Sequence, residues 1–313
     1  MRVGIIGAGL CGLAAARELI ARGHEVVVIE KSRGVGGRLA SRRIEGTVVD
    51  HGAPTIEVPP LSALGDLVRS LPQEDLVDLG PGIVTYRSGA TRLAKLMAEG
   101  VEVVLGVRIS AIRAARGGFE LAGEQGNTHG VVDAVVISAP APQAADLLKA
   151  SPEAGDRVAV LRGAVYNPAV VVLAGLRIAS PSALEPFAVD GPLLRITAES
   201  AKGREPVRGV VPIVARLTPA ASVEMLEASD ADILAGVTPR LSAICGTTSA
   251  PEWAQVKRWR YAVLPRPCDA RLVNPEGSRI VVCGDTLAGG GLADVYASGV
   301  AVARSLADVA PSS

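Results

Sequence analysis

The chain has 313 residues, 49% of them hydrophobic and 20% charged, and its formal net charge at pH 7 is zero. This balance argues against nucleic acid or an anionic membrane surface as a partner, and no apolar run approaches the roughly 18 residues of a membrane helix. The length favours two lobes, and an apolar pattern that starts at residue 3 leaves no room for a signal peptide, so we expect a cytoplasmic protein that acts on a small molecule.

A glycine-rich turn between two apolar runs opens the chain. Residues 3–6 are typical of a buried parallel strand, and a helix over 13–22 and a second strand over 25–30 follow. The GxGxxG glycines allow a tight turn, a close approach of the backbone to a pyrophosphate, and close packing of the helix. Glu30 lies 18 residues beyond the last glycine, where a carboxylate can accept hydrogen bonds from a ribose. We therefore predict a dinucleotide site rather than an ordinary strand-helix turn. Its residues are Gly7, Ala8, Gly9, Leu10, Cys11, Gly12, Glu30 and Lys31.

A second glycine cluster, residues 34–38, follows the Glu30 strand directly. A nicotinamide enzyme has no general need of it, whereas FAD is longer and runs on past the pyrophosphate. With Glu30 before it and residues 50–53 after it, this cluster resembles the opening of the flavin amine oxidase superfamily. The resemblance implies that one group of residues lies along the FAD pyrophosphate and another near the flavin ring. The first group is Gly36, Gly37 and Arg38, and the second is Gly52, Ala53, Pro54 and Thr55. The alternative for Arg38 is a solvated loop arginine.

Helical and strand patterns alternate between residues 59 and 148. The predicted elements are a helix within 59–81, a short strand and turn over 84–89, a helix over 90–98, strands over 101–105, 107–112, 117–122 and 131–138, and a helix over 143–148. The stretch from residue 101 resembles the superfamily's return to the cofactor lobe. That resemblance implies a contact between the backbone of Val107 and the adenine.

The pattern of apolar runs and loops in residues 151–261 predicts a second sheet with helices. The predicted elements are strands over 158–160, 170–174 and 209–215, a loop over 178–186, and two amphipathic helices within 220–244.

An aromatic pair closes this region, in the run from Lys257 to Ala262. The run, followed by Pro265, resembles the renalase branch of the superfamily. Trp259 and Tyr261 are two residues apart, so in a strand they point to the same face, and we expect them to form a wall of the substrate pocket. The alternative is an aromatic face packed in the core.

The last unit, from residue 280, combines a buried strand with a final helix. The resemblance places Gly284 and Asp285 near the ribityl phosphate of the cofactor. It also directs the backbone N–H groups of Gly291, Leu292 and Ala293 at the flavin N1 and O2, where a helix N-terminus stabilises negative charge. Tyr296, on the same helix, is assigned to the substrate pocket together with Trp259, Tyr261 and His51.

These patterns predict an α/β fold with a discontinuous Rossmann-like FAD-binding lobe and a second lobe of mixed sheet and helices. The FAD lobe comprises residues 1–58, 89–150 and 262–313, and the substrate lobe residues 59–88 and 151–261. The four cysteines form no CxxC pair, so we expect no metal site, and no cysteine or histidine fits a flavin-attachment pattern, so we expect non-covalent FAD.

No protein side chain is assigned as a catalytic residue, because the flavin would do the chemistry and the three histidines show no triad spacing. His51, beside Gly52, is the histidine to test, with a structural role as its alternative. Three functions remain open: a renalase-like oxidase of dihydronicotinamide isomers, an oxidase or desaturase of another substrate such as an amine or a carotenoid-like molecule, and a non-catalytic flavin-binding carrier.

Overall fold

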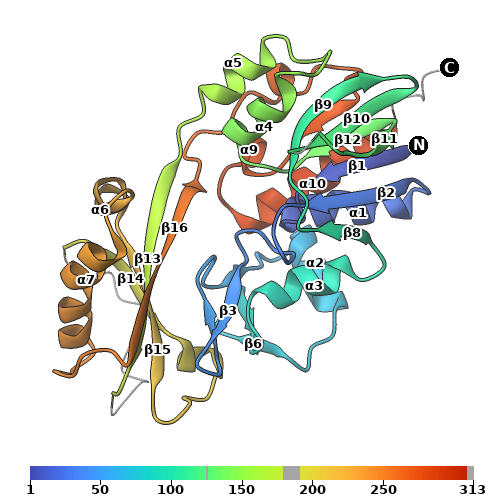
Figure 1. The fold of residues 1–313 in the computed structure, drawn as a ribbon. Coiled ribbons are helices and arrows are strands. Elements are labelled where there is room, and N and C mark those ends of the chain that lie inside the picture. The colour runs from blue at the N-terminus through green and yellow to red at the C-terminus, as the bar shows by residue number, and fades with distance from the viewer. Residues whose placement is uncertain (125, 179–190, 309–313) are drawn as a thin grey trace.

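The computed structural model describes residues 1–124, 126–178 and 191–308. Its central element is a five-stranded parallel sheet in the order β17-β12-β1-β2-β8. The strands are β1 (Arg2–Ile6), β2 (Glu25–Glu30), β8 (Glu102–Leu105), β12 (Ala134–Ile137) and β17 (Ile280–Val282). The sheet thus unites the beginning, middle and end of the chain, as predicted for a discontinuous Rossmann-like lobe (Figure 1).

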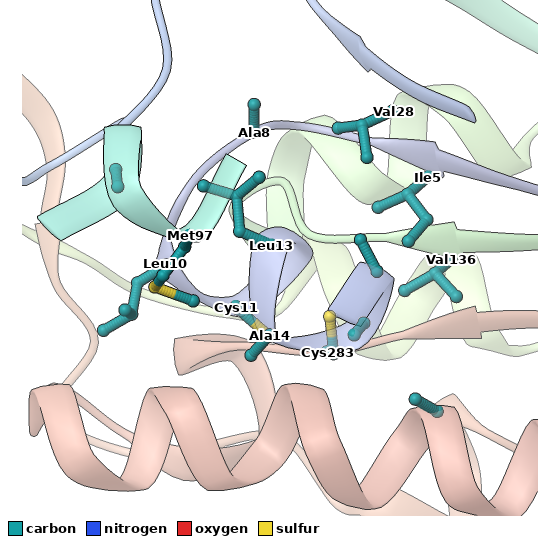
Figure 2. Close-up of a cluster of buried hydrophobic side chains, with 14 of the residues drawn as sticks. Ile5, Ala8, Leu10, Cys11, Leu13, Ala14, Val28, Met97, Val136 and Cys283 are labelled. Atoms are coloured by element: carbon teal, nitrogen blue, oxygen red, sulfur yellow. The ribbon is translucent and has the colours of Figure 1, made fainter. Parts of the chain in front are cut away.

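Each face of this sheet carries its own hydrophobic core. One face packs against α1 (Leu10–Ala21) and α10 (Leu292–Ala307), which also contact each other. In this core, Ile5, Val28 and Val136 of the strands meet α1 (Figure 2). The other face is covered by α4 (Ala141–Leu148), α5 (Arg157–Arg162) and the antiparallel sheet β11-β10-β9. The strands of that sheet are β9 (Ile109–Ala115), β10 (Gly118–Gly123) and β11 (Thr128–Val132).

A second, antiparallel sheet has the order β14-β15-β13-β16. Its strands are β13 (Asn167–Leu176), β14 (Leu193–Ala198), β15 (Val211–Leu217) and β16 (Trp253–Val263). One face packs against α6 (Pro219–Met225) and α7 (Asp230–Ile244), and the other against the hairpin of β3 (Ser41–Ile44) and β4 (Thr47–Asp50). The long strands β13 and β16 run side by side and connect the two halves of the molecule (Figure 1).

The structure also has a small sheet, β5-β7-β6, with two helices beside it in the sequence. The elements are β5 (Ile56–Glu57), α2 (Ala63–Ser70), β6 (Leu76–Asp78), β7 (Ile83–Tyr86) and α3 (Thr91–Ala98). Their buried side chains belong to the same core as α1 and α10, so residues 59–88 pack with the Rossmann-like lobe. The remaining short helices are η2 (Glu199–Lys202), α8 (Ala270–Val273) and α9 (Asp285–Ala288).

Three predictions of secondary structure were wrong in type or extent. Residues 158–160 belong to helix α5, because helical spacing turns Arg157 and Leu161 together toward the core, where Arg157 Nη2 donates to the carbonyl oxygen of Ile280 at 2.5 Å. The run 131–138 divides into β11 and β12, and the helix within 59–81 is only α2, followed by β6. The predicted loop over 178–186 lies, beyond its first residue, outside the described residues.

No helix in the described ranges combines the length and the apolar character needed to cross a membrane.

Candidate functional site

A cavity of about 1910 Å³ runs from the carboxyl ends of the parallel strands to the second sheet. Residues that follow each of the five parallel strands line it, which is where ligands bind in open α/β sheets. These residues are Gly7, Lys31, Val107, Ser138 and Gly284. The opposite end is lined by residues of the second sheet, including Ala169, Arg195, Arg216 and Trp259.

The first glycine turn is shaped to receive a phosphate group. Gly7 has φ +107°, and a Cβ on Gly12 would lie 2.0 Å from the carbonyl oxygen of Gly7, so α1 packs directly on the turn. A Cβ on Gly9 would meet nothing within 4 Å, and this residue lines the cavity. Helix α1 starts beside it without a side-chain cap, so its first N–H groups are available to an anion. These features fit the predicted pyrophosphate site.

Glu30, the predicted ribose ligand, lies at the end of β2 and lines the cavity. Its carboxylate accepts hydrogen bonds from the backbone N–H groups of Ala8 at 2.9 Å and Ser32 at 2.8 Å, and it is 7% exposed. Each carboxylate oxygen has a second lone pair for a ribose hydroxyl. Val107 is adjacent, because its N–H donates to the carbonyl oxygen of Glu30 at 3.0 Å. The two residues predicted to contact the adenosine thus lie next to each other.

The second glycine cluster packs on the first. The N–H of Gly36 donates to the carbonyl oxygen of Ala8 at 2.8 Å, and a Cβ on Gly37 would lie 3.4 Å from Cα of Gly9. Arg38 is no solvated loop arginine, because its Nη1 lies 2.7 Å from Oδ2 of Asp285. This ion pair joins two segments that the sequence assigned to the cofactor.

The residues that the sequence assigned to the cofactor fall into two groups. Most line the cavity, while a few lie behind its wall and support the turns. The first group includes Gly7, Gly9, Leu10, Cys11, Glu30, Lys31, Gly37, Arg38, Gly52, Ala53, Pro54, Thr55, Val107, Gly284, Asp285, Gly291 and Leu292. Ala8, Gly12, Gly36 and Ala293 are not in the lining.

Tyr296 does not line the cavity either, although the sequence assigned it to the substrate pocket. Its half-buried ring packs against the core of α1 and α10, and this burial raises its pKa. Helix α10 turns this residue away from the cavity, so its assignment is corrected to a packing role.

The aromatic wall on β16 is present at the far end of the cavity. Trp259 Nε1 donates to the carbonyl oxygen of His51 at 2.7 Å, and the two rings stack with centroids 5.7 Å apart at 18°. Tyr261 meets the ring of Tyr166 edge-on at 5.3 Å. Lys257 Nζ lies 5.0 Å from the Trp259 ring, so the strand is regular enough to put both side chains on one face. His51, Trp259 and Tyr261 all line the cavity.

His51 is uncharged near neutral pH. Burial, followed by the positive charges of Arg42 and Lys257, lowers its pKa to about 4, and its Nδ1 is buried without a hydrogen-bond partner. The neutral ring is therefore a surface for stacking rather than a proton donor.

The pKa of His51 predicts a specific loss of stability in acid. Because folding lowers this pKa from its usual 6.5, the contribution of His51 is fully present above pH 6.5 and is lost as the pH falls toward 4. Between pH 7 and pH 5 we expect the wild type to lose about 2 kcal/mol more unfolding free energy than His51→Gln. Urea unfolding of both proteins with saturating FAD measures the difference, and equal losses would contradict it.

A buried cluster of four charges lies directly behind His51, and the sequence did not predict it. Lys202 Nζ lies 2.9 Å from both Asp50 Oδ2 and Glu199 Oε1, and Arg204 pairs with the same two carboxylates. All four residues are at most 5% exposed. The cluster joins β4, which precedes His51, to η2 of the second lobe.

The two acids of this cluster respond differently to it. Burial alone would raise the pKa of Asp50, but Lys202 and Arg204 lower it overall. Asp50 also accepts hydrogen bonds from Ser41 Oγ at 2.6 Å and from the N–H of Ala90 at 3.0 Å. For Glu199, burial is the larger effect and raises the pKa. The cluster is a cross-link between elements, and it keeps Asp50 away from the cavity.

Comparison with known protein families identifies two matches along the chain. A family described as NAD(P)-binding Rossmann-like domain matches residues 5–71, and one described as Flavin containing amine oxidoreductase matches residues 61–307. Together they cover the glycine turn, the aromatic wall and the final helix.

Two curated proteins are similar to short stretches of the chain. A 4,4'-diapophytoene desaturase of Staphylococcus haemolyticus is 37% identical over 81 residues, which is 26% of this chain and 16% of the desaturase. The desaturase of Staphylococcus aureus strain Newman is 45% identical over 60 residues, 19% of this chain and 12% of that protein. The matches thus span only a small part of the length of these relatives.

Among solved structures, the similarity covers the whole fold at low identity. A putative protoporphyrinogen oxidase from Exiguobacterium has a TM-score of 0.73 and 16% identity, with 98% of both chains covered. A putrescine oxidase bound to putrescine has a TM-score of 0.71 and 15% identity, covering 97% of this chain and 98% of that one.

Proposed function

This chain belongs to the family of flavin containing amine oxidoreductases, and we propose that within it the protein is a renalase-like oxidase that removes a hydride from a dihydronicotinamide isomer. The enzyme class, an FAD-dependent oxidoreductase, follows from the family. The substrate is our inference from the walls of the cavity.

The residues around the first half of the cavity fit FAD. The Gly9 turn and the uncapped start of α1 would hold the pyrophosphate, and Glu30 would accept hydrogen bonds from the ribose. The start of α10 at Gly291 also has no side-chain cap and lines the cavity, so its N–H groups can face the flavin. FAD, when bound, supplies the hydride acceptor and passes the electrons to oxygen or another acceptor.

The observation that carries the proposal is the chemistry of the opposite wall. Among the described residues that line the cavity, the carboxylates all come from the Rossmann-like lobe, and the second sheet contributes none. It contributes Trp259 and Tyr261, beside the neutral ring of His51, and five cations, of which Arg258 and Arg260 are paired with acids outside the lining. A wall of this kind suits a flat ring that already carries a transferable hydride and needs no general base. A cationic amine would meet like charges there.

The aromatic wall would position such a ring. A dihydropyridine stacked on Trp259 would be held parallel to a flat cofactor, with its hydride-bearing carbon within the ~3–3.5 Å of a reactive arrangement. Trp259 is fixed for this purpose by its hydrogen bond to the carbonyl oxygen of His51 and by stacking on that residue's ring. The role of these side chains is to orient the substrate and to exclude water.

The second candidate is an oxidase or desaturase of another substrate. The short stretches of 37–45% identity to 4,4'-diapophytoene desaturases favour a desaturase over an amine oxidase. A long apolar substrate would not use the cations of the second sheet, which is why we prefer the first candidate.

Anaerobic mixing tests the proposal directly. We expect the 2- and 6-dihydro isomers of NAD(P) to bleach the flavin absorbance band of the oxidised protein, because their hydride needs only orientation. A panel of primary and secondary amines, mixed in the same way, should leave the band unchanged.

Two outcomes would contradict the proposal. Rapid bleaching by an amine without bleaching by the isomers would favour an amine oxidase. Bleaching by neither would leave the desaturase, which an apolar polyene presented in detergent would then test.

A further inference from the structure

Three cations form a row across the second sheet. In the strand register, Val171 of β13 pairs with Lys257 of β16 on one side and with Arg216 of β15 on the other, and Arg216 pairs with Arg195 of β14. Directly paired residues point to the same face of a sheet. The row therefore reads Lys257, Val171, Arg216, Arg195, with all four side chains on one face.

That face is the wall of the cavity. Val171 packs with Trp259 and with Val49 of the β3–β4 hairpin, so the row faces the Rossmann-like lobe rather than α6 and α7. Lys257, Arg216 and Arg195 all line the cavity. Arg216 Nη2 donates to the carbonyl oxygen of Gly52 at 2.7 Å, which places it beside the segment expected to pass the flavin ring.

No carboxylate balances these charges within the described residues. No described carboxylate forms an ion pair within 4 Å of the side-chain nitrogens of Lys257, Arg216 or Arg195. By contrast, the neighbouring Arg258 and Arg260 on β16 pair with Asp230 and Glu227. Arg195 Nε is buried without any hydrogen-bond partner. Burial, and then the charge of Arg195, lower the pKa of Arg216.

Such an arrangement is unfavourable for the protein alone. Like charges directly opposite each other in a sheet are destabilising, and a buried guanidinium N–H without an acceptor loses its hydration without compensation. A bound anion would remove both costs, because a guanidinium donates two parallel hydrogen bonds to a carboxylate or phosphate.

We propose that the row Lys257, Arg216 and Arg195 is an oxoanion subsite that binds a carboxylate or phosphate group of the substrate. It is separate from the cofactor's pyrophosphate site, which lies on the first lobe at the Gly9 turn. Trp259 lies two residues from Lys257 on the same strand face, so a ring stacked on Trp259 would direct an anionic substituent along the row. The placement of that ring rests on the proposed function, whereas the subsite does not.

The test compares ligands that differ in charge but keep the same ring. The FAD-bound protein is titrated with nicotinate and with nicotinamide for a carboxylate, and with nicotinamide mononucleotide and nicotinamide riboside for a phosphate. The readout is the shift of the flavin absorbance band, which needs no turnover. We expect the anionic member of at least one pair to bind about tenfold tighter or more, since hydrogen bonds to charged groups are individually strong. The pair that shows the preference identifies the anion.

Variants assign the preference to the row. Arg195→Gln should abolish the preference, and Arg195→Lys should retain part of it, because the charge remains. Arg177→Gln is the matched control, since Arg177 follows β13, pairs with Glu252 and is not in the cavity lining. It should keep the full preference, and FAD content and thermal unfolding show that each variant is folded.

Equal binding of the anionic and the neutral member in both ligand pairs would overturn the subsite. An anion preference that persists in each of the single variants Arg195→Gln and Arg216→Gln would also overturn it. Its failure is distinguishable from that of the proposed function. Bleaching by dihydronicotinamide isomers without an anion preference refutes the subsite alone, whereas an anion preference without bleaching supports the subsite and refutes the proposed reaction.

Discussion

Glu30→Ala should weaken FAD binding by about ten- to a hundredfold. A carboxylate that accepts hydrogen bonds from ribose hydroxyls contributes roughly 1.5–3 kcal/mol, which corresponds to that range of affinity. Glu30 also accepts hydrogen bonds from the N–H groups of Ala8 and Ser32, so its removal loosens the glycine turn as well. The substitution therefore affects both the ribose contact and the geometry of the phosphate site.

The measurement starts from apoprotein and titrates FAD by flavin fluorescence. His51→Ala is the comparison, because His51 lies at the other end of the cavity and contacts Trp259 rather than the adenosine side. Glu30→Gln is a second comparison, since an amide can accept hydrogen bonds through only one of its two terminal atoms. We expect the order of affinity to be wild type, Glu30→Gln, Glu30→Ala. Equal losses in Glu30→Ala and His51→Ala would refute the ribose role.

The Rossmann-like lobe was predictable because its signals are local. The apolar run before Gly7, the glycine spacing and the position of Glu30 all lie within 30 residues, and the structure puts them at the end of β1 and β2 as expected. The contact between Arg38 and Asp285 was not predicted. The resemblance placed each residue along the cofactor, but nothing local in either segment indicates a partner 247 residues away.

The second lobe was less predictable because its function depends on strand register. Arg195 and Arg216 carry no motif, and only the pairing of β14 with β15 shows that they share a face. The sequence from Glu199 to Arg204 has the composition of a solvated surface turn, yet the structure buries three of its charges against Asp50. Hydrophobic periodicity also predicted the wrong element at residues 158–160, because three residues are too few to distinguish a strand from a helix such as α5.

Lys202→Met should lower the unfolding free energy by about 3–5 kcal/mol, which is the usual cost of removing one partner of a buried ion pair. Lys202 is 1% exposed, and its Nζ donates to Asp50 Oδ2 and Glu199 Oε1, both at 2.9 Å. Without it, two buried carboxylates would share the single positive charge of Arg204. Because the cluster joins β4 to η2, we also expect the loss to loosen the backbone around His51 and Gly52.

Urea unfolding with saturating FAD measures the change, and two further variants test its cause. Lys149→Met makes the same substitution at an exposed pair with Asp146, and it should change stability by no more than about 1 kcal/mol. The double variant Lys202→Met/Glu199→Gln restores the balance of one acid, Asp50, against one base, Arg204. If an unbalanced buried charge is the cause, the double variant should be more stable than Lys202→Met alone. If the double variant is instead less stable, the loss comes from packing and hydrogen bonds, and the electrostatic account of the cluster is wrong.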